Sequence, residues 1–184
     1  MALPATLLQI ARALLEDRGS DPALLALAIT PPDAAYVAAL EPVLDVDGVV
    51  AARAFLMREL ALALRPQFEA VYAQRRVRAT YAPTSDKAGA RKLANMCLHY
   101  LARIDDAAAR ALAVAHYDGA DNMTDSYGAL LALRDSTGPE RDALYARFET
   151  RWRDEPLVLD KWFALEATAE RDDALARVSG RACV

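Results

Sequence analysis

The stretch DKAGARKLANMCLHYLAR, residues 86–103, shows most clearly how this chain folds. Its apolar side chains recur three and four positions apart, which is the spacing of one face of an α-helix. Pro83, Thr84 and Ser85 precede it and provide a loop and a helix start. The pattern therefore predicts a helix whose buried stripe consists of Leu93, Met96, Cys97, Tyr100 and Leu101.

Toward the N-terminus, prolines, glycines and aspartates divide the chain into further helices. We expect one helix over residues 4–18, a second from Asp21-Pro22 to residue 29 and a brief third that ends near residue 40. A long helix follows, which Asp45 or Asp47 caps and which runs through residue 64. Pro66 either kinks this helix or starts a separate one, and the sequence leaves both readings open.

Toward the C-terminus the same signals continue. Asp105 or Asp106 caps a helix to about residue 116, Asp121 or Asn122 caps the next, and helices start at Gly138-Pro139 and at Pro156. The helix from Gly138-Pro139 places Leu144, Phe148 and Trp152 four positions apart, so we expect them on one buried stripe. No window of strand length alternates strictly between apolar and polar residues. Short helices joined by tight turns predict an all-α fold, which is a bundle or an α-solenoid of antiparallel helix hairpins.

Composition excludes several functional classes. The chain has 184 residues, 54% hydrophobic content and a net charge of -4, so it can bury a core but has no broad positive field for nucleic acid or a membrane surface. Its longest apolar runs are far shorter than the roughly 20 residues that a spanning helix needs. The N-terminus lacks a basic region ahead of an apolar stretch, so we expect no secretory signal and a cytoplasmic location.

Two short motifs combine a helix-start signal with apolar side chains. An exposed helix start can hold a substrate carboxylate, but Asp121 and its neighbours are also good cap residues, and capping is the interpretation we favour. In the second motif the aromatic side chains suit a helix–helix contact, in which the indole N–H needs one partner. The motif residues are Asn122, Met123, Thr124 and Asp125, and Asp160, Lys161, Trp162 and Phe163. Met123 and Tyr127, one turn further on, are expected to be buried.

At this separation the two motifs resemble the C-terminal α-helical domain of the aminopeptidase N family, which are zinc metallopeptidases. The runs at residues 21–24, 53–61, 91–95 and 158–163 follow the same order as in that domain. The resemblance covers residues 1–178 as a single helical domain and implies a right-handed superhelix of the ARM/HEAT type. Residues 179–184 do not resemble the family's continuation, and we expect them to be a tail on a truncated segment.

The resemblance implies a non-catalytic role. In the family this domain closes over the active-site chamber and restricts which peptides reach the zinc. The family's His-Glu-x-x-His helix and Gly-x-Met-Glu-Asn motif are both absent here, so no catalytic, cofactor-binding or metal-binding residue is carried over and the chain should be inactive alone. The expected partners are the remaining domains of the enzyme, and a solenoid cut in mid-stack is expected to self-associate through its exposed end.

Other candidate sites have simpler explanations. His99 and His116 are 17 positions apart, and Cys97 and His99 point to opposite sides of one helix, so neither pair predicts a metal site. His116 lies near a helix end and is expected to act as a cap, while Cys97 is expected to lie in the core.

The clusters of charged residues are likewise explained by their positions at helix ends. The basic run at residues 75–78 lies between Tyr72 and Tyr81, but three arginines at a helix end complement its dipole better than they predict nucleic-acid binding. The acidic pairs at 105–106 and 172–173 stand where helices begin, so we interpret them as caps and not as an acid–base couple. The alternative function from the residues themselves is a free-standing helical-repeat module that binds a protein or peptide.

Overall fold

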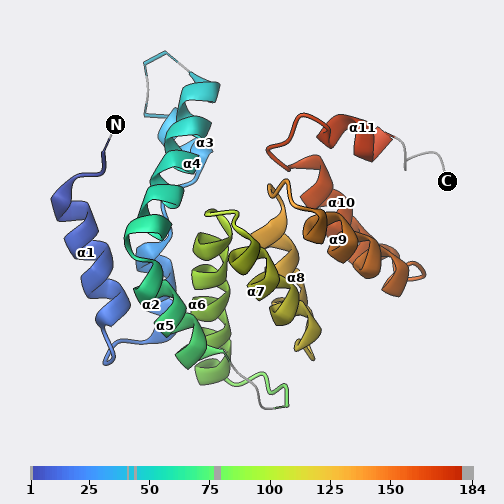
Figure 1. Ribbon diagram of the computed structural model, residues 1–184, viewed down its shortest axis with the longest axis horizontal. Helices are drawn as coiled ribbons and strands as arrows, with labels where there is room; N and C mark the ends of the chain where they lie inside the picture. The colour runs from blue at the N-terminus through green and yellow to red at the C-terminus, as the bar shows by residue number, and fades with distance from the viewer. Residues whose placement is uncertain (1, 41, 44, 77–79, 180–184) are drawn as a thin grey trace. The chain divides into compact units, whose positions relative to one another are not determined.

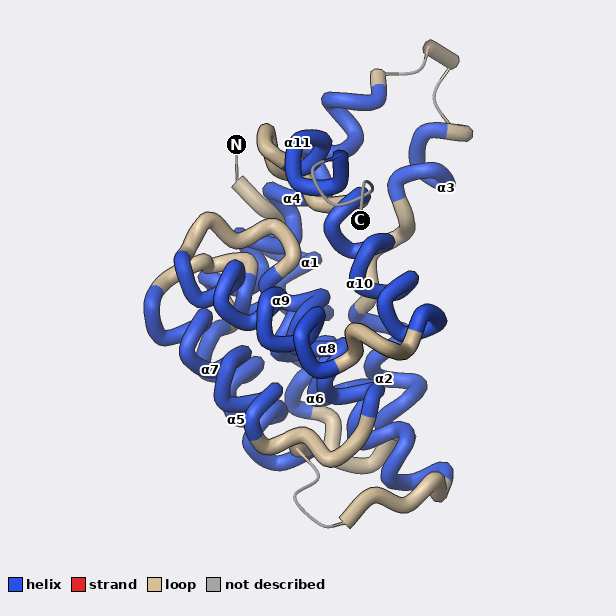
Figure 2. The backbone as a smooth tube through the Cα atoms, turned by 90° about the vertical axis from the view of Figure 1, so that its right-hand side faces the viewer, coloured by secondary structure: helices blue, strands red, loops and turns tan. Residues whose placement is uncertain are grey.

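The computed structural model describes residues 2–40, 42–43, 45–76 and 80–179. Figure 2 shows helices and loops throughout this part of the chain and no strand. The all-α prediction is therefore confirmed. None of the helices among these residues combines the length and the apolar content that crossing a membrane would take.

The chain divides into two compact units, residues 1–104 and 105–184. The first unit contains α1 (Ala5–Glu16), α2 (Pro22–Ile29), α3 (Ala34–Ala38), α4 (Val46–Ala63), α5 (Arg65–Arg75) and α6 (Ser85–Ala102) (Figure 1). The second contains α7 (Ala107–Asp118), α8 (Met123–Leu133), α9 (Pro139–Arg151), α10 (Pro156–Ala167) and α11 (Ala174–Ser179). The single domain over residues 1–178 stays a prediction, and the predicted tail, residues 179–184, lies outside the described residues except for Ser179.

Local chemistry sets most helix starts. Asp21 caps α2 by accepting hydrogen bonds from the backbone N–H groups of Ala23 and Leu24, and Pro22 occupies its first position. Asp45 caps α4, which settles the choice between Asp45 and Asp47. Pro66 starts a separate helix, because Leu64 leaves the helical conformation (φ −119°, ψ 22°) before α5 begins.

In unit 1, α6 packs against both α2 and α5, and the three helices lie next to one another in Figure 1. Gly89 permits the close approach to α2, since a Cβ built there would lie 3.3 Å from the backbone nitrogen of Ala23. The ring of Tyr100 stacks on Phe68 with centroids 4.6 Å apart, and its hydroxyl donates to the carbonyl of Ile29 at 2.7 Å. Cys97 is fully buried as predicted, and burial raises the pKa of its thiol to about 12. The predicted stripe is buried apart from Met96, which is half-buried.

In unit 2, α7 packs against α8 and α9, and α10 packs against α9 and α11. Leu144 and Phe148 lie on the buried stripe of α9 as predicted. Trp152, predicted on the same stripe, is only partly buried because it ends the helix as its C-cap residue. The buried apolar positions of α8 and α9 are Ala129, Leu130, Ala132, Leu133, Leu144, Tyr145 and Phe148.

Candidate functional site

The first sequence motif forms the start of α8. Asn122 is the N-cap residue, and its side-chain oxygen accepts a hydrogen bond from the backbone N–H of Asp125 at 3.0 Å. The amide nitrogen of Asn122 donates in turn to a carboxylate oxygen of Asp125 at 2.9 Å. The structure thus selects Asn122 over Asp121 as the cap. Met123 and Tyr127, which the sequence reading placed in the core, are only half-buried, and Thr124 is exposed.

Asp125 also meets a histidine that sequence reasoning did not connect with it. His116 lies in the last turn of α7, as expected, but is almost fully buried, and its Nε2 lies 3.7 Å from a carboxylate oxygen of Asp125. Asp125 itself is 7% exposed. The first motif therefore joins the end of α7 to the start of α8 through a buried polar contact, besides capping α8.

The second motif forms the contact between α10 and α9. Trp162 is 1% exposed, and its indole N–H donates to the backbone carbonyl of Tyr145 at 3.2 Å. This is the hydrogen-bond partner that its burial required. Phe163 lies edge-on to Trp162, with ring centroids 5.0 Å apart. Asp160 and Lys161 are exposed on the same helix.

A buried ion pair lies beside this aromatic contact. The guanidinium of Arg141 donates to both carboxylate oxygens of Glu166, at 3.1 and 2.9 Å, and both side chains are almost completely buried. Its Nε donates to the carbonyl of Arg134 at 3.2 Å, and the group stacks on the ring of Tyr145 at 4.0 Å. The hydroxyl of Tyr145 donates to the carbonyl of Leu130 at 2.9 Å, and burial raises the pKa of this phenol.

Arginines and carboxylates also hold the last helix of unit 2. Arg177 of α11 donates to Asp142 of α9 at 2.8 Å and to Asp173 at 2.6 Å. Arg171 donates to Asp173 at 2.8 Å and also to the carbonyl of Ser136. These arginines, Arg171 first, lower the pKa of Asp173 well below its ordinary value. Asp173 immediately precedes α11, but its carboxylate accepts hydrogen bonds from these arginines, which the cap interpretation did not include.

The two residues of the other acidic pair, Asp105 and Asp106, have different roles. Asp106 caps α7 by accepting from the backbone N–H of Ala109 at 2.7 Å, as predicted for one of the two residues. Asp105 has a positive φ of 55° and its carboxylate accepts hydrogen bonds from the hydroxyls of Ser136 and Thr137. A non-glycine residue in this region is uncommon. Asp105 therefore ties the loop between α8 and α9 to the start of α7.

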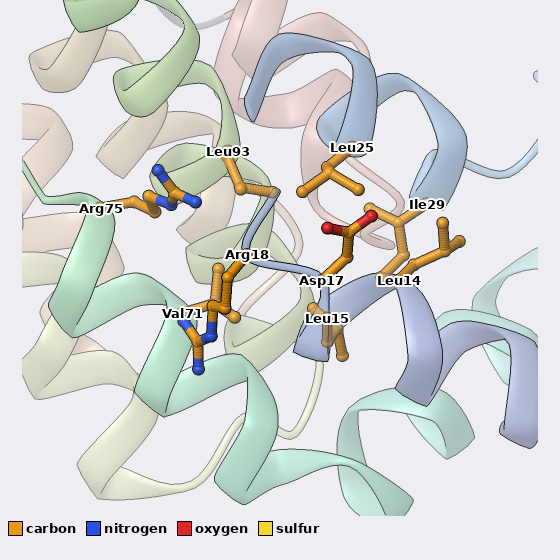
Figure 3. A pocket seen from close by; sticks show the side chains of 9 residues that line it. All are labelled: Leu14, Leu15, Asp17, Arg18, Leu25, Ile29, Val71, Arg75 and Leu93. Carbon is orange, nitrogen blue, oxygen red and sulfur yellow. The ribbon is translucent and has the colours of Figure 1, made fainter. Parts of the chain in front are cut away.

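The basic run and the small hollow in unit 1 offer little room for a ligand. Arg75 lies in the last turn of α5, while Val77 and Arg78 lie outside the described residues. Tyr81 contacts Arg91 by a cation–π interaction at 4.8 Å. Figure 3 shows Arg75, Asp17 and Arg18 among aliphatic side chains of a hollow of only about 10 Å³, which is room for about one water molecule.

The described residues do not fit a metal site. No group of three or more His, Cys, Asp or Glu side chains that could hold an ion is gathered in the part of the chain that the structure describes. His116 faces Asp125, and His99 lies 3.5 Å from a nitrogen of Arg103. The charged groups of unit 2 contact one another and join its helices. This arrangement is suited to stabilising the packing of the helices.

Comparison with known proteins places this geometry in context. The family model described as "Domain of unknown function (DUF3458_C) ARM repeats" matches residues 1–182. Aminopeptidase N of Haemophilus influenzae is 39% identical over 132 residues, which is 72% of this chain and 15% of that protein. Aminopeptidase N of Escherichia coli is 33% identical over 180 residues, or 98% of the chain and 21% of that protein. The Caulobacter vibrioides aminopeptidase N is 32% identical over 92% of the chain and 20% of its own length.

A solved structure agrees at the level of the fold. Legionella pneumophila aminopeptidase A, solved in complex with aspartic acid, aligns with a TM-score of 0.83 at 22% identity over 99% of this chain and 22% of that one. At this identity the likeness concerns the fold alone. The ARM-repeat description of the family confirms the predicted α-solenoid class. The chain spans between 15% and 21% of the length of the curated relatives it matches.

Proposed function

Since this chain belongs to the DUF3458_C family of ARM-repeat domains, we propose that it is a non-catalytic helical part of an aminopeptidase that restricts which peptides reach the catalytic site. The observation that carries the proposal is the match of 72% to 98% of the chain to 15% to 21% of the length of three enzymes called aminopeptidase N. These matches confirm the predicted resemblance to the C-terminal domain of that family.

The packing of unit 2 supports a scaffold role. One sequence motif caps α8 and the other packs α10 against α9. The most buried charged groups of the unit, Arg141 and Glu166, form an ion pair with each other. Groups engaged in this way hold a surface in place without taking part in a reaction. A rigid helical wall is what control of access to a chamber requires. The zinc of the parent enzyme and a cytoplasmic location remain predictions.

The experiment measures access separately from chemistry. In aminopeptidase N of Escherichia coli, the region that matches this chain is removed, and kcat/KM is measured for a short alanyl chromogenic substrate and for peptides of increasing length. We expect the discrimination against long peptides to weaken while the short substrate is still hydrolysed. Unchanged length selectivity in a folded variant would contradict the proposal.

A second measurement uses this chain alone. The purified protein is incubated with the alanyl substrate, with and without added zinc, and we expect no turnover. A zinc-dependent rate that co-purifies with the chain and survives further purification contradicts the non-catalytic assignment. Circular dichroism of the same sample shows that an inactive chain is folded.

A further inference from the structure

Arg91 of α6 is a buried cation without a carboxylate partner. Its side chain is 5% exposed, and its two terminal nitrogens donate to one neutral acceptor, the carbonyl of Ala82, at 3.4 and 3.3 Å. Hydrogen bonds between an arginine and a carboxylate are shorter, about 2.7–2.9 Å. No Asp or Glu side chain forms an ion pair with Arg91 in the part of the chain that the structure describes. A buried charge without a counter-charge is costly, so this position requires a physical explanation.

The buried Arg141 of unit 2 shows what Arg91 lacks. Each guanidinium lies over a tyrosine ring, that of Arg91 over Tyr81 at 4.8 Å and that of Arg141 over Tyr145 at 4.0 Å. Each also donates to a backbone carbonyl. Arg141 in addition binds both carboxylate oxygens of Glu166, at 3.1 and 2.9 Å. The surroundings of the two arginines therefore share a ring and a carbonyl, and they differ in the carboxylate.

The neighbouring charged groups do not supply the missing anion. Asp86, five positions before Arg91, lies on a different side of α6, and a hydrogen bond from the side chain of Thr84 lowers its pKa. Asp21, at the start of α2, accepts from the backbone of its own helix. Lys87, one turn before Arg91 and on the same face, is half-buried and adds a second positive charge. This face of α6 therefore attracts an anion from outside the chain.

The groups that cover Arg91 are weakly held. Tyr81 and Ala82 belong to the non-helical connection that leads into α6, and Tyr81 is 46% exposed although its ring lies against the guanidinium. The carbonyl of Ala82 is bound only through the two long hydrogen bonds from Arg91 among those that the structure gives it. An anion that displaces this carbonyl breaks two weak bonds and gains a bidentate, charge-assisted pair. Arg91 is therefore accessible through a small movement of this connection.

We propose that Arg91 binds an external carboxylate in the way that Arg141 binds Glu166, and that the carbonyl of Ala82 takes its place when none is bound. The guanidinium then holds both carboxylate oxygens with the ring of Tyr81 against it, and Lys87 strengthens the attraction from one turn away. The carboxylate either ends a peptide or belongs to an Asp or Glu side chain, since both present the same pair of oxygens. This inference concerns binding by the chain itself and does not rest on the proposed function.

The first test measures binding and identifies the source of the carboxylate. Amide chemical shifts of the purified chain are followed by NMR at constant ionic strength during additions of three probes. Acetyl-dialanine ends in a carboxylate, acetyl-aspartate amide carries one on its side chain, and acetyl-dialanine amide has none. We expect saturable shifts at Tyr81 and Ala82, with a dissociation constant in the millimolar range, for one or both carboxylates and none for the amide. No shift with any probe, or equal shifts with all three, overturns the proposal.

The second test removes one positive charge at two places. Arg91→Gln removes the proposed partner of the carboxylate, and Lys161→Gln makes the same change in net charge at an exposed position of α10. Arg91→Gln should raise the dissociation constant of the probe at least about tenfold, and Lys161→Gln should leave it unchanged. Circular dichroism shows whether Arg91→Gln is folded. Equal weakening in the two folded variants would mean that the probe responds to net charge alone, which contradicts the proposal.

The third test supplies the carboxylate within the chain and leaves Arg91 in place, so it also serves if Arg91→Gln does not fold. Tyr81→Glu introduces a carboxylate beside Arg91 from a half-exposed position, and Tyr81→Gln is its uncharged control. Both variants lose the ring, so they differ only in charge. Tyr81→Glu should unfold at a higher temperature than Tyr81→Gln and should no longer bind the probe, while Tyr81→Gln still binds it. If the two variants bind the probe equally, Arg91 is not its partner and the proposal is wrong.

Discussion

The two units are both built from short helices but bury different side chains. Among the described residues, unit 1 buries a single charged side chain, Arg91, and is held by apolar contacts such as the stack of Phe68 on Tyr100. Unit 2 buries the pair of Arg141 and Glu166 as well as His116 and Asp125. The same class of fold is thus stabilised mainly by apolar burial in one unit and by apolar burial plus paired charge in the other.

This difference has a physical consequence. Apolar contacts tolerate the loss of one partner gradually, in proportion to the area and the cavity involved. A buried ion pair does not, because removal of one member leaves the other charge unsolvated. Unit 2 should therefore be more sensitive than unit 1 to the deletion of a single charged side chain.

The largest expected loss of stability comes from breaking the buried pair of Arg141 and Glu166. Glu166→Ala should lower the free energy of unfolding by about 3–5 kcal/mol, because Arg141 would remain buried without its bidentate partner. Denaturant unfolding followed by circular dichroism measures the loss. The control is Glu69→Ala in unit 1, which removes an exposed ion pair with Arg65 and should cost at most about 1 kcal/mol.

The double replacement Arg141→Met with Glu166→Leu sharpens the same point. Because both charges are removed together, it should be far less destabilising than Glu166→Ala. If Glu166→Ala costs no more than its surface control, buried charge is not what distinguishes the two units.

The next effect compares two buried hydroxyls. Tyr100→Phe leaves the carbonyl of Ile29 without its side-chain donor, and Tyr145→Phe does the same to the carbonyl of Leu130. Each should cost about 1–3 kcal/mol. As the two tyrosines contact different carbonyls in different units, the double variant should show the sum of the single effects to within about 0.5 kcal/mol. A clear departure from additivity would show that the units are not energetically separate.

Helix caps provide a smaller comparison. Asp21→Ala removes the cap of α2 in unit 1, and Asn122→Ala removes the cap of α8 in unit 2. Both should lower the free energy of unfolding by about 0.5–2 kcal/mol. Asn122→Ala should lie at the upper end, because Asp125 also loses the amide donor beside His116. Equal costs would mean that the hydrogen bond from the Asn122 amide to Asp125 adds nothing to the cap.

The smallest effect concerns α11, which has no buried residue. The pKa of Asp173 is lowered by Arg171 and Arg177, so its contribution is present at neutral pH and is lost as the pH falls below its ordinary value of 3.8 through the lowered folded-state pKa. Acid or high salt should release α11 before unit 1 unfolds. Amide chemical shifts of Ala174 and Leu175, followed by NMR during an acid titration, report the release. Arg177→Ala should show the same shifts at neutral pH, and unchanged shifts would mean that these ion pairs do not hold the helix.

Much of the fold was predictable because its signals are local. A proline fixes its own φ and an aspartate caps the helix that follows it, so the starts of α2, α9 and α10 could be read within a few residues. The choice at Pro66 could not be made, since kinked and separate helices share the same local pattern. Burial of Met123, Met96 and Trp152 was overestimated because periodicity gives the face of a helix but not how far its neighbours cover it.

The site was less predictable because it depends on distant partners. Sequence reasoning foresaw that Trp162 needs a hydrogen-bond acceptor, but not that the acceptor is the carbonyl of Tyr145, 17 positions earlier. The pairing of Arg141 with Glu166 spans 25 positions and has no signature in either residue's neighbourhood. Asp105 resembles an ordinary cap residue, and only the tertiary structure shows its positive φ and its role in tying a distant loop.

The buried thiol of Cys97 provides a built-in chemical probe for the opening of unit 1. Alkylating reagents attack the thiolate, and a side chain that is fully enclosed and has a pKa of about 12 presents almost none of that form. Modification must therefore wait until α6 separates from its neighbours. In a Cys183→Ser background, the labelling rate of this one sulfur would therefore measure the opening of unit 1. It would not report the breaking of ion pairs among the arginines of unit 2.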